Sequence, residues 1–570
     1  MAQGQHIVVF GFSGVARRIV KQLAKVSPRV IVVDPALGQS ELLTLRRYGV
    51  EYLAGYGQSL EVLLAADVAH ARAAVCVTDD DLRNIEIALL VREQSADVRI
   101  VVQMANGNVG RALERVTQPS TVLDVADLAS IAFVEQAVNR PSHPLTLGRR
   151  RFHVTNVPCP RAGTLRSIWG DIAPIAVRSA DGESVTCPSR DRLVDGDAMV
   201  TLLGTEDEFR AAGLGDRLAS PRPRHRSPLS RAREAVRAAV DAIDRPFRWA
   251  LGIMATLAAA SVGVLMAGYV EPGGQRMGLL DALYFTVETI ATVGFGDFSF
   301  RSQGPWLRGW AIVMMLLGAV LVYTAVALLT NALVSRRLAQ SIGRQRVTGM
   351  RDHIVVIGLG AVGSKVALDL HEAGYDVAVI DSGTGQRFVP LMRTAGIPVL
   401  IGDPTLPETQ REAGVHRAAG VAVLSNDDLL NIETGLAVRA VVGERRIPVA
   451  LRVFGRNLAR VIDRSLDIGA TRSVAELAAP WFVGAACGLD VEGTFYVGEV
   501  PFIAARIAVV PGDGLAGQAI GTLSDATRFV AIDRADGSFE HPLQRDTVFH
   551  PGDHAYVVGK FEDLLDLLRW

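Results

Sequence analysis

The fold of this chain is constrained above all by an internal repeat that encloses an apolar segment. In each copy a β-branched run enters a glycine-rich turn, and 23 residues after the first glycine an acid closes a second apolar run. Residues 11–34 correspond to residues 358–381, and residues 78–86 align with 425–433 without a gap, always 347 positions apart. One register kept over this length predicts two βαβ domains of one fold, each with a buried parallel sheet.

The segment between the two copies is apolar enough to enter a membrane. Residues 247–270 are almost wholly apolar, residues 306–334 contain a long uncharged run, and the shorter residues 279–291 are amphipathic. About 20 apolar residues are needed for a helix to span a bilayer. The sequence therefore predicts α/β Rossmann-type domains flanking an all-α membrane part, in which two spanning helices enclose a half-span.

A glycine-containing loop, Thr292-Val293-Gly294-Phe295-Gly296-Asp297, follows the half-span. Glycine adopts positive φ as easily as negative φ, so alternating glycines can point successive carbonyls in one direction. Four such loops around an axis would stack rings of oxygen that replace the water shell of K⁺, with expected ion sites at Thr292, Val293, Gly294 and Phe295. The alternative is an ordinary membrane hairpin with a glycine loop.

Residues 288–297, together with their apolar flanks, resemble the two-helix potassium channels. The resemblance implies that residues 292–297 form the selectivity filter. It also implies that Glu288 on the pore helix faces Asp297 and braces the filter, and that Tyr284 and Phe285 belong to an aromatic cuff around it.

Both halves of the chain resemble the regulator-of-K⁺-conductance (RCK) domain, a Rossmann lobe followed by a small α+β C-lobe. Residues 196–204 and 552–559 read as equivalent turn-plus-strand endings of the two C-lobes. The expected boundaries are 1–145 and 146–210 for the two lobes of the first RCK domain, 211–246 for a linker with an interfacial helix, 247–335 for the pore domain, 336–350 for a gating linker, and 351–487 and 488–570 for the lobes of the second RCK domain.

The second Rossmann lobe carries a complete dinucleotide-binding fingerprint, Gly358-Leu359-Gly360-Ala361-Val362-Gly363. The first glycine permits a tight turn, the second lets a pyrophosphate approach the backbone, and the third lets the helix pack on the strand. Asp381 is expected to accept from ribose hydroxyls. Asp403 lies where the RCK resemblance places a residue near the adenosine. The expected ligand is NAD(H) or an adenine nucleotide, ATP or ADP.

The first Rossmann lobe has a degenerate version of this site. Gly11, Gly14 and Asp34 remain, but Ser13 replaces the second glycine and adds a side chain where phosphate would approach. Arg17 could compensate with its charge. We expect a weaker second nucleotide site here and favour a scaffold role.

Two further features each keep two interpretations open. The acidic stretches 79–81 and 427–428 are either ligands for a divalent cation or helix caps with solvated neighbours, and we favour the caps. Gly318 in the second spanning helix is either a gating hinge or a small residue that permits close helix packing.

Charge sets the expected orientation and excludes one class of partner. Arginines crowd residues 231–248 before the first span and 336–346 after the second, so both termini should lie in the cytoplasm and the protein in the cell (inner) membrane. Lys and Arg number 59 against 60 Asp and Glu, and this balance argues against a nucleic-acid-binding protein.

These observations favour a homotetrameric potassium channel gated by nucleotide binding to a cytoplasmic ring of RCK domains. The sequence presents no catalytic constellation, so we do not expect an enzyme. Two alternatives remain open: a membrane-anchored NAD-dependent oxidoreductase, and a non-conducting RCK regulatory subunit of a potassium transport system. Residue chemistry does not identify the nucleotide or the direction of its effect on the pore.

Overall fold

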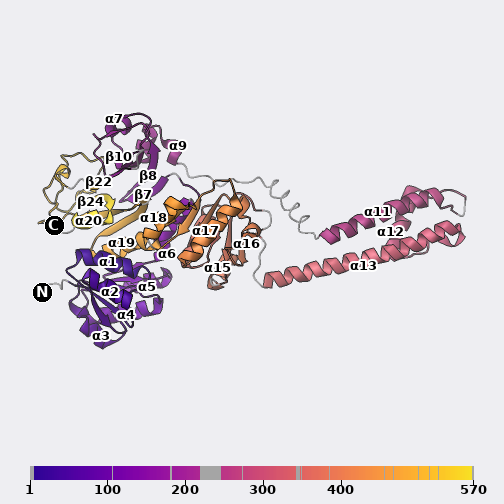
Figure 1. Ribbon diagram of the computed structural model, residues 1–570, viewed down its shortest axis with the longest axis horizontal. Coiled ribbons are helices and arrows are strands. Elements are labelled where there is room, and N and C mark those ends of the chain that lie inside the picture. The colour runs from indigo at the N-terminus through magenta and orange to yellow at the C-terminus, as the bar shows by residue number, and fades with distance from the viewer. Residues whose placement is uncertain are drawn as a thin grey trace. The chain divides into compact units, whose positions relative to one another are not determined.

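The computed structural model describes residues 6–218, 245–341, 347 and 350–567, except positions 106, 141, 180–182, 272–273, 384–385, 455, 467, 499, 513 and 524–525. The chain divides into two compact units, one formed by Met1–Pro223 with Met350–Trp570 and the other by Arg224–Gly349. We describe each unit by itself (Figure 1).

The first Rossmann lobe is a six-stranded parallel sheet in the order β3-β2-β1-β4-β5-β6. Its strands are β1 (His6–Phe10), β2 (Arg29–Asp34), β3 (Glu51–Ala54), β4 (Ala73–Cys76), β5 (Arg99–Gln103) and β6 (Ser120–Leu123). Its helices are α1 (Ala16–Val26), α2 (Gln39–Tyr48), α3 (Leu60–Ala65), α4 (Asp81–Gln94) and α5 (Gly107–Val116). The central strands β1 and β4 are buried along their whole length, because helices cover both faces of a parallel sheet.

The second Rossmann lobe repeats this topology, in the order β16-β15-β14-β17-β18-β19. Its strands are β14 (Ile354–Ile357), β15 (Val377–Asp381), β16 (Val399–Ile401), β17 (Gly420–Val423), β18 (Val449–Arg452) and β19 (Ala470–Arg472). Its helices are α14 (Ala361–Glu372), α15 (Val389–Thr394), α16 (Pro407–Glu412), α17 (Asp428–Val442) and α18 (Arg456–Ser465). The predicted repeat of one α/β fold is confirmed.

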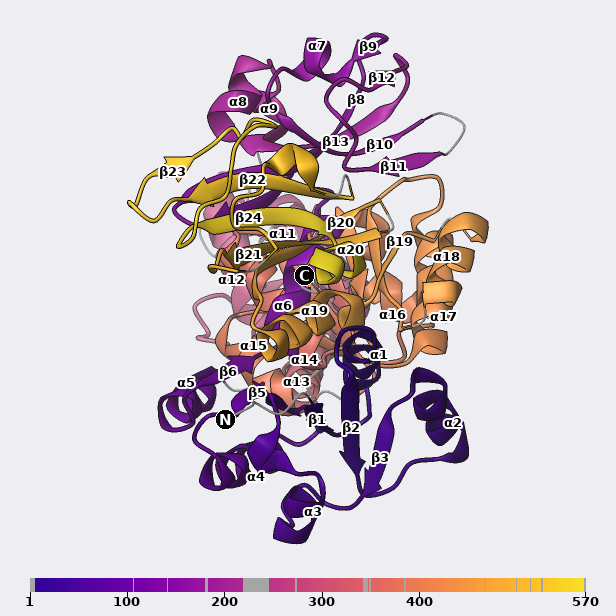
Figure 2. The same cartoon turned by 90° about the vertical axis from the view of Figure 1, so that its left-hand side faces the viewer.

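The two Rossmann lobes exchange their last helices. Helix α6 (Val125–Ala137) follows the first sheet but packs against α14 and β17 of the second lobe, while α19 (Val474–Cys487) packs against α1 and β4 of the first (Figure 2). The approach is close enough that a Cβ on Gly420 would lie 1.9 Å from the Ala137 carbonyl oxygen. The sequence did not predict this exchange, which merges the two RCK domains into one unit.

The C-lobes are two five-stranded sheets that share a hydrophobic core. The first contains β7 (Ser142–Leu147), β8 (Arg150–Pro158), β10 (Ala173–Arg178), β11 (Ser184–Thr186) and β13 (Met199–Thr205), with the short β9 (Gly163–Thr164), β12 (Leu193–Val194), α7 (Leu165–Trp169), α8 (Glu206–Ala211) and α9 (Gly215–Leu218). The second contains β20 (Asp490–Val497), β21 (Val500–Ala508), β22 (Thr527–Asp533), β23 (Phe539–Glu540) and β24 (His554–Lys560), with α20 (Phe561–Leu567). The predicted endings become β13 and β24, which each pair with two neighbours inside their sheets.

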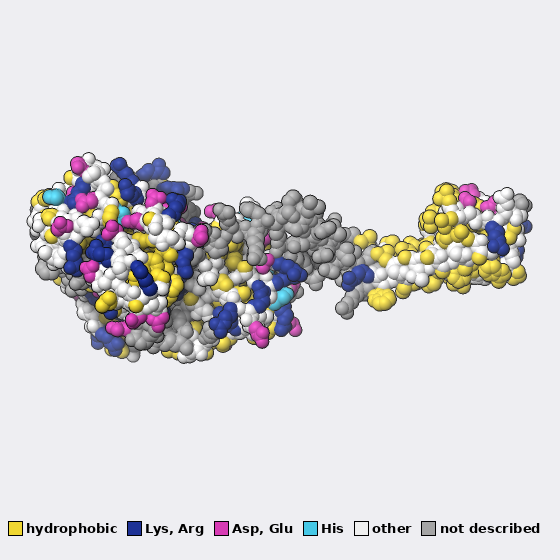
Figure 3. All heavy atoms as spheres, turned by 90° about the horizontal axis from the view of Figure 1, so that it is seen from above, with side chains coloured by type: hydrophobic (Ala, Val, Ile, Leu, Met, Phe, Trp, Pro, Cys, Tyr) yellow, Lys and Arg dark blue, Asp and Glu magenta, His cyan; other side chains and the backbone are white. Residues whose placement is uncertain are grey.

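The membrane unit consists of α11 (Arg245–Gly268), α12 (Leu279–Ile290) and α13 (Pro305–Ser341). Two of these helices, α11 and α13, are long and apolar enough to cross a membrane. Hydrophobic side chains cover much of the face that is visible in Figure 3, and charged ones gather near its ends.

Several expected boundaries differ from the observed elements. Helix α13 runs to Ser341, seven residues beyond the expected end of the second span, so the gating linker starts as helix. Helix α9 occupies part of the expected linker, and β7 crosses the expected boundary at residue 145. The expected interfacial helix at 229–243 and the gating-linker residues 342–346 and 348–349 lie outside the described residues.

Candidate functional sites

The filter loop has an alternating backbone. Thr292, Gly294 and Gly296 have φ of 58°, 61° and 86°, whereas Val293 and Phe295, which lie between them, are not in the positive-φ region. Positive φ is costly for a residue with a Cβ, so Thr292 holds an unfavourable conformation that the rest of the loop must fix. This alternation is what the sequence pattern predicts for carbonyls that turn to one side.

Two side chains from α12 hold the loop. The Glu288 carboxylate accepts from the Gly296 N–H at 3.3 Å, and the Tyr284 hydroxyl donates to Asp297 at 3.0 Å. We expected Glu288 to face Asp297. Instead Glu288 accepts from the Gly296 N–H, and the Asp297 carboxylate accepts from the Tyr284 hydroxyl. Glu288 is 5% exposed, so its hydrogen bond to the Gly296 N–H is shielded from water.

The aromatic residues around the loop form one cluster. Phe285 stacks on Phe300 with ring centroids 4.8 Å apart, and it also meets Phe298 and Tyr269. Tyr269 is tied to the loop through its hydroxyl, which donates to the Ser299 carbonyl at 3.1 Å. Such edge and stacked contacts stabilise beyond simple burial and make a stiff wall.

Gly318 lies on α13 against the end of α12. A Cβ added there would be 3.3 Å from a side-chain carbon of Ile290 and 3.4 Å from its Cα. This contact supports the close-packing interpretation, and the hinge interpretation stays a prediction.

A cavity of about 900 Å³ lies between the two Rossmann lobes. Residues at the N-terminal ends of five helices line it, namely α1, α6, α14, α17 and α19. Helix N-termini present free N–H groups and a partial positive charge, so their convergence favours a polyanion. The volume falls within the range of small-molecule sites.

The three fingerprint glycines have distinct surroundings. Gly358 has a φ of 97°, and a Cβ on it would meet the Ser425 backbone nitrogen at 2.8 Å. A Cβ on Gly363 would lie 1.9 Å from the Gly358 carbonyl oxygen, so only glycine permits α14 to pack here. Gly360 caps α14, and no atom of the described residues lies within 4 Å of its Cβ position, which leaves its backbone open to the cavity.

Asp381, the predicted ribose partner, lines the cavity, whereas Asp403, the predicted adenosine partner, does not. Asp381 lines the cavity, but its carboxylate accepts from the N–H groups of Leu359 and Gly383, each at 2.8 Å, and so fixes the glycine turn. Asp403 is exposed and accepts from Thr405, while its neighbour Pro404 lines the cavity instead. Leu359, Ala361 and Val362 also line it.

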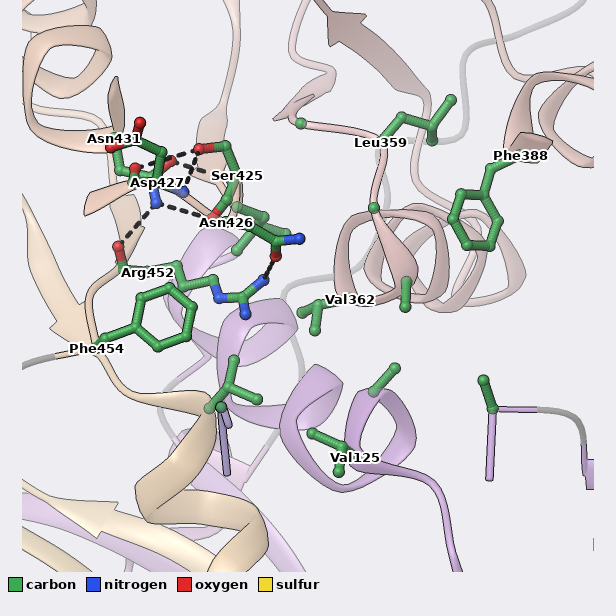
Figure 4. A pocket seen from close by; sticks show the side chains of 18 of the residues that line it. Val125, Leu359, Val362, Phe388, Ser425, Asn426, Asp427, Asn431, Arg452 and Phe454 are labelled. Carbon is green, nitrogen blue, oxygen red and sulfur yellow. Dashed lines mark hydrogen bonds between the residues drawn. The ribbon is translucent and has the colours of Figure 1, made fainter. Parts of the chain in front are cut away.

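Sequence reasoning missed Arg452, which lies at the end of β18 in the cavity wall. It is 8% exposed, donates to the Asn426 side chain at 2.6 Å, and lies over the Phe454 ring with its carbon 4.7 Å from the centroid (Figure 4). Its Nε is buried and has no hydrogen-bond partner among the residues that the structure describes. Burial lowers the pKa of Arg452 to about 10, against a smaller opposing effect of Asp428, so the guanidinium is charged at neutral pH.

A buried cation with an unused donor beside a helix N-terminus points to an anionic ligand. The sequence signal that could have identified Arg452 was its position at the carboxyl end of a strand, the same edge of the sheet at which the glycine loop follows β14.

The first lobe lacks an open counterpart of this site. Ser13 and Gly14 line the same cavity, but the Ser13 hydroxyl donates to Asp79 at 2.6 Å. Arg17 forms an ion pair with Glu41 and also donates to the Phe12 carbonyl, so it does not compensate for the lost glycine. Asp34 accepts from the Phe12 N–H at 3.1 Å, much as Asp381 does in the second lobe. Gly11 keeps its turn with a φ of 97°.

The acidic stretches act as caps. Asp80 accepts from the Leu82 N–H at the start of α4, and Asp427 accepts from the N–H groups of Leu429 and Leu430 at the start of α17. Among the described residues no group of three or more His, Cys, Asp or Glu side chains is placed to hold a metal ion.

Three family models match the chain. The TrkA-N domain model matches residues 7–122 and 354–472, the ion channel model residues 251–335, and the TrkA-C domain model residues 504–570.

Individual relatives cover smaller shares. The chain is 24% identical over 176 residues to the voltage-gated potassium channel Kch of Escherichia coli, which covers 30% of this chain and 42% of Kch. It is 23% identical over 310 residues to potassium channel protein 1 of Methanocaldococcus jannaschii, which covers 51% of this chain and 88% of that protein. An uncharacterized protein of Methanothermus fervidus is matched over 25% of its length, so the chain spans less than half the length of two of these relatives.

Among solved structures, the GsuK RCK domain is similar over 100% of this chain and 95% of its own, with a TM-score of 0.49 and 17% identity. The GsuK channel bound to NAD is similar over 100% and 79%, with a TM-score of 0.48 and 17% identity. On the matches to two TrkA-N domains, the ion-channel domain between them and the TrkA-C domain, the chain belongs to the two-transmembrane-helix potassium channels that carry RCK domains.

Proposed function

We propose that this protein is a homotetrameric K⁺ channel of the cell membrane, and the alternating backbone of residues 292–297 carries the proposal. Carbonyls that turn to one side can replace the hydration shell of a dehydrated K⁺ ion only when several loops face one another. Val293 and Phe295 are 53% and 71% exposed in a single chain, as expected for a loop whose remaining neighbours come from other subunits.

The same arrangement needs four chains and a lipid environment. Only 22% and 17% of the apolar windows of α11 and α13 are buried within the chain, so most of their surface is left for other subunits and for lipid. The C-terminal end of α12 leads directly into the filter, and its partial negative charge stabilises a cation held beneath it.

In a tetramer, the exposed apolar faces of two helices of the RCK unit would be covered by neighbouring copies of the chain. Leu82 and Leu89 on α4 are 63% and 42% exposed, and their repeat equivalents Leu429 and Leu436 on α17 are 64% and 46% exposed. Residues seven apart share a helix face, so each lobe presents one apolar stripe. The repeat of the stripe in both lobes fits contacts between copies of this chain in a ring of eight domains.

The regulatory ligand is an adenine nucleotide or NAD(H) in the cavity of the second lobe. The Gly360 backbone at the N-terminus of α14 would receive the phosphates, and the buried Arg452 would bind the phosphate farther from the adenosine. The first lobe contributes walls rather than a second equivalent site, because Ser13 and Arg17 are engaged by other side chains.

Gating follows if the ligand prefers one shape of the ring. A shift from 1% to 99% open requires about 5.5 kcal/mol of differential binding. Shared among four ligands this is about 1.4 kcal/mol each, or a tenfold preference per site. Such a preference lies well within the energy of one charge-assisted hydrogen bond.

Rubidium flux into liposomes that contain the purified chain tests the proposal. Wild-type protein should pass Rb⁺ and not Na⁺, and nucleotide should change the rate. G294A and G296A place a Cβ at positive φ and should abolish flux, whereas G309A on α13, where the added Cβ meets nothing within 4 Å, should keep it. No flux with or without nucleotide would refute the channel, and cofactor turnover would favour an oxidoreductase.

A further inference from the structure

The cavity carries an aromatic side chain at the end opposite to Arg452. Phe388 precedes α15, is partly buried and lines the cavity (Figure 4). Arg387 also lines the cavity. The Arg387 guanidinium lies over the Phe388 ring, 4.6 Å from its centroid, and the Arg387 side chain is exposed. A planar cation on a ring is a surface on which a nucleobase stacks.

The position of this pair follows from the course of the chain around the sheet. Asp381 ends β15, and Arg387 and Phe388 follow it, whereas Arg452 ends β18 on the other side of the central strand β14. The glycine turn after β14 lies between these two ends. A nucleotide whose phosphates rest on the glycine turn and reach Arg452 therefore directs its base toward Phe388.

The first lobe differs at this position. Glu41 lies 347 residues before Phe388, and it is the partner of Arg17. An acid in place of the ring removes the stacking surface, in the same lobe in which Ser13 closes the phosphate position. The two differences occur together, as expected if Phe388 serves the ligand rather than only the core.

We propose that Phe388, with Arg387, is the base platform of the regulatory site and sets a preference for purine over pyrimidine nucleotides. This inference rests on the proposed function, because it requires a nucleotide in the second-lobe cavity. A purine offers two fused rings to the platform and a pyrimidine only one, so loss of stacking costs a purine ligand more.

The test compares ATP, CTP and tripolyphosphate by calorimetry on the full chain in lipid nanodiscs. Wild-type protein should bind ATP more tightly than CTP. F388L keeps an apolar side chain for the core and removes the ring, so ATP affinity should fall about 5- to 150-fold, the range of one aromatic–base stack, with tripolyphosphate affinity unchanged. L391A is the matched control, because Leu391 lies on α15, which directly follows Phe388, is 45% exposed and lies outside the cavity lining.

The outcomes separate this inference from the proposed function. An unchanged ratio of ATP to CTP affinity in F388L would overturn the platform, even if R452M weakens both nucleotides and so supports the site. Absence of binding of all three probes to wild-type protein would refute both. F388W retains a ring, should keep the ATP preference, and should show quenched indole fluorescence on ATP addition; loss of the preference there would also count against stacking.

Discussion

Two glycines of the fingerprint, Gly360 at the N-cap of α14 and Gly363 in its first turn, should respond differently to the same substitution: one should lose ligand affinity and the other folding stability. In G360A the new methyl group meets nothing within 4 Å, and the backbone at φ −86° accepts alanine. Alanine is a poorer N-cap than glycine, by roughly 0.5–1 kcal/mol, but it also restricts the unfolded chain by about 0.4–1 kcal/mol. The two effects nearly cancel, so folding stability should change by less than about 0.5 kcal/mol, which is a Tm shift of roughly 2 °C or less.

The same methyl group would lie where a phosphate approaches the α14 N-terminus. Loss of one charge-assisted hydrogen bond costs about 1.5–3 kcal/mol, so the Kd for ATP should rise roughly 10- to 150-fold. In G363A the methyl group would lie 1.9 Å from the Gly358 carbonyl oxygen, so this variant should lose about 3 kcal/mol of stability by overpacking. Calorimetric ATP titration and thermal unfolding of both variants provide the measurements. An unchanged Kd in G360A, or equal destabilisation by both changes, would refute the assignment of Gly360 to the phosphate.

Three further predictions address the cavity and the seams between domains. R452M removes the buried cation and its unused donor, so ATP affinity should fall roughly 10- to 100-fold in calorimetry with little change in Tm; an equal loss of Tm would indicate a structural role. G420A places a methyl group against the Ala137 carbonyl, so hydrogen exchange along α6 should accelerate, whereas G107A, with open space around it, should not change it. Burial alone raises the pKa of Glu208, but hydrogen bonds from His541 and Thr205 outweigh it and hold the pKa below the ordinary 4.5. The contact between the C-lobes is thus stabilised above pH 4.5 and should open as the pH falls through the lower pKa of Glu208. Hydrogen exchange of peptides around His541 will detect the opening. E208Q should abolish this dependence of the exchange on pH.

The sequence predicted the features that depend on neighbouring residues. The alternating φ of residues 292–297, the glycine turns and the caps at Asp80 and Asp427 all arise from local steric and hydrogen-bonding preferences, and the repeat predicted that both lobes share one fold.

The side-chain contacts that form only in the folded chain could not be predicted from the sequence. Arg17 was expected near phosphate, but its guanidinium forms an ion pair with Glu41. Glu41 lies on α2, after β2, and approaches Arg17 only in the folded lobe. Asp297 was expected opposite Glu288, but Tyr284, which lies one turn before Glu288 on the same helix, donates its hydroxyl to the Asp297 carboxylate instead. Arg452 could be identified as a candidate ligand-binding residue only from the structure, in which its buried Nε has no hydrogen-bond partner among the described residues.

The exchange of α6 and α19 changes what a ligand in the second lobe can do. Val125, at the start of α6, lines the cavity, so a first-lobe helix is part of the ligand's surroundings. The same helix is tied to the second lobe by an ion pair of Asp127 with Lys365 at 2.7 Å. The carbonyls at the end of α19 accept from Arg72 and Arg99 of the first lobe. Polar contacts therefore hold each exchanged helix to the lobe on which it packs. A ligand that shifts the N-terminus of α14 must therefore move α6 and with it the first lobe. In the proposed channel, one nucleotide site per chain would then be sufficient to move both Rossmann lobes, including the first lobe, in which Ser13 and Arg17 are engaged by other side chains.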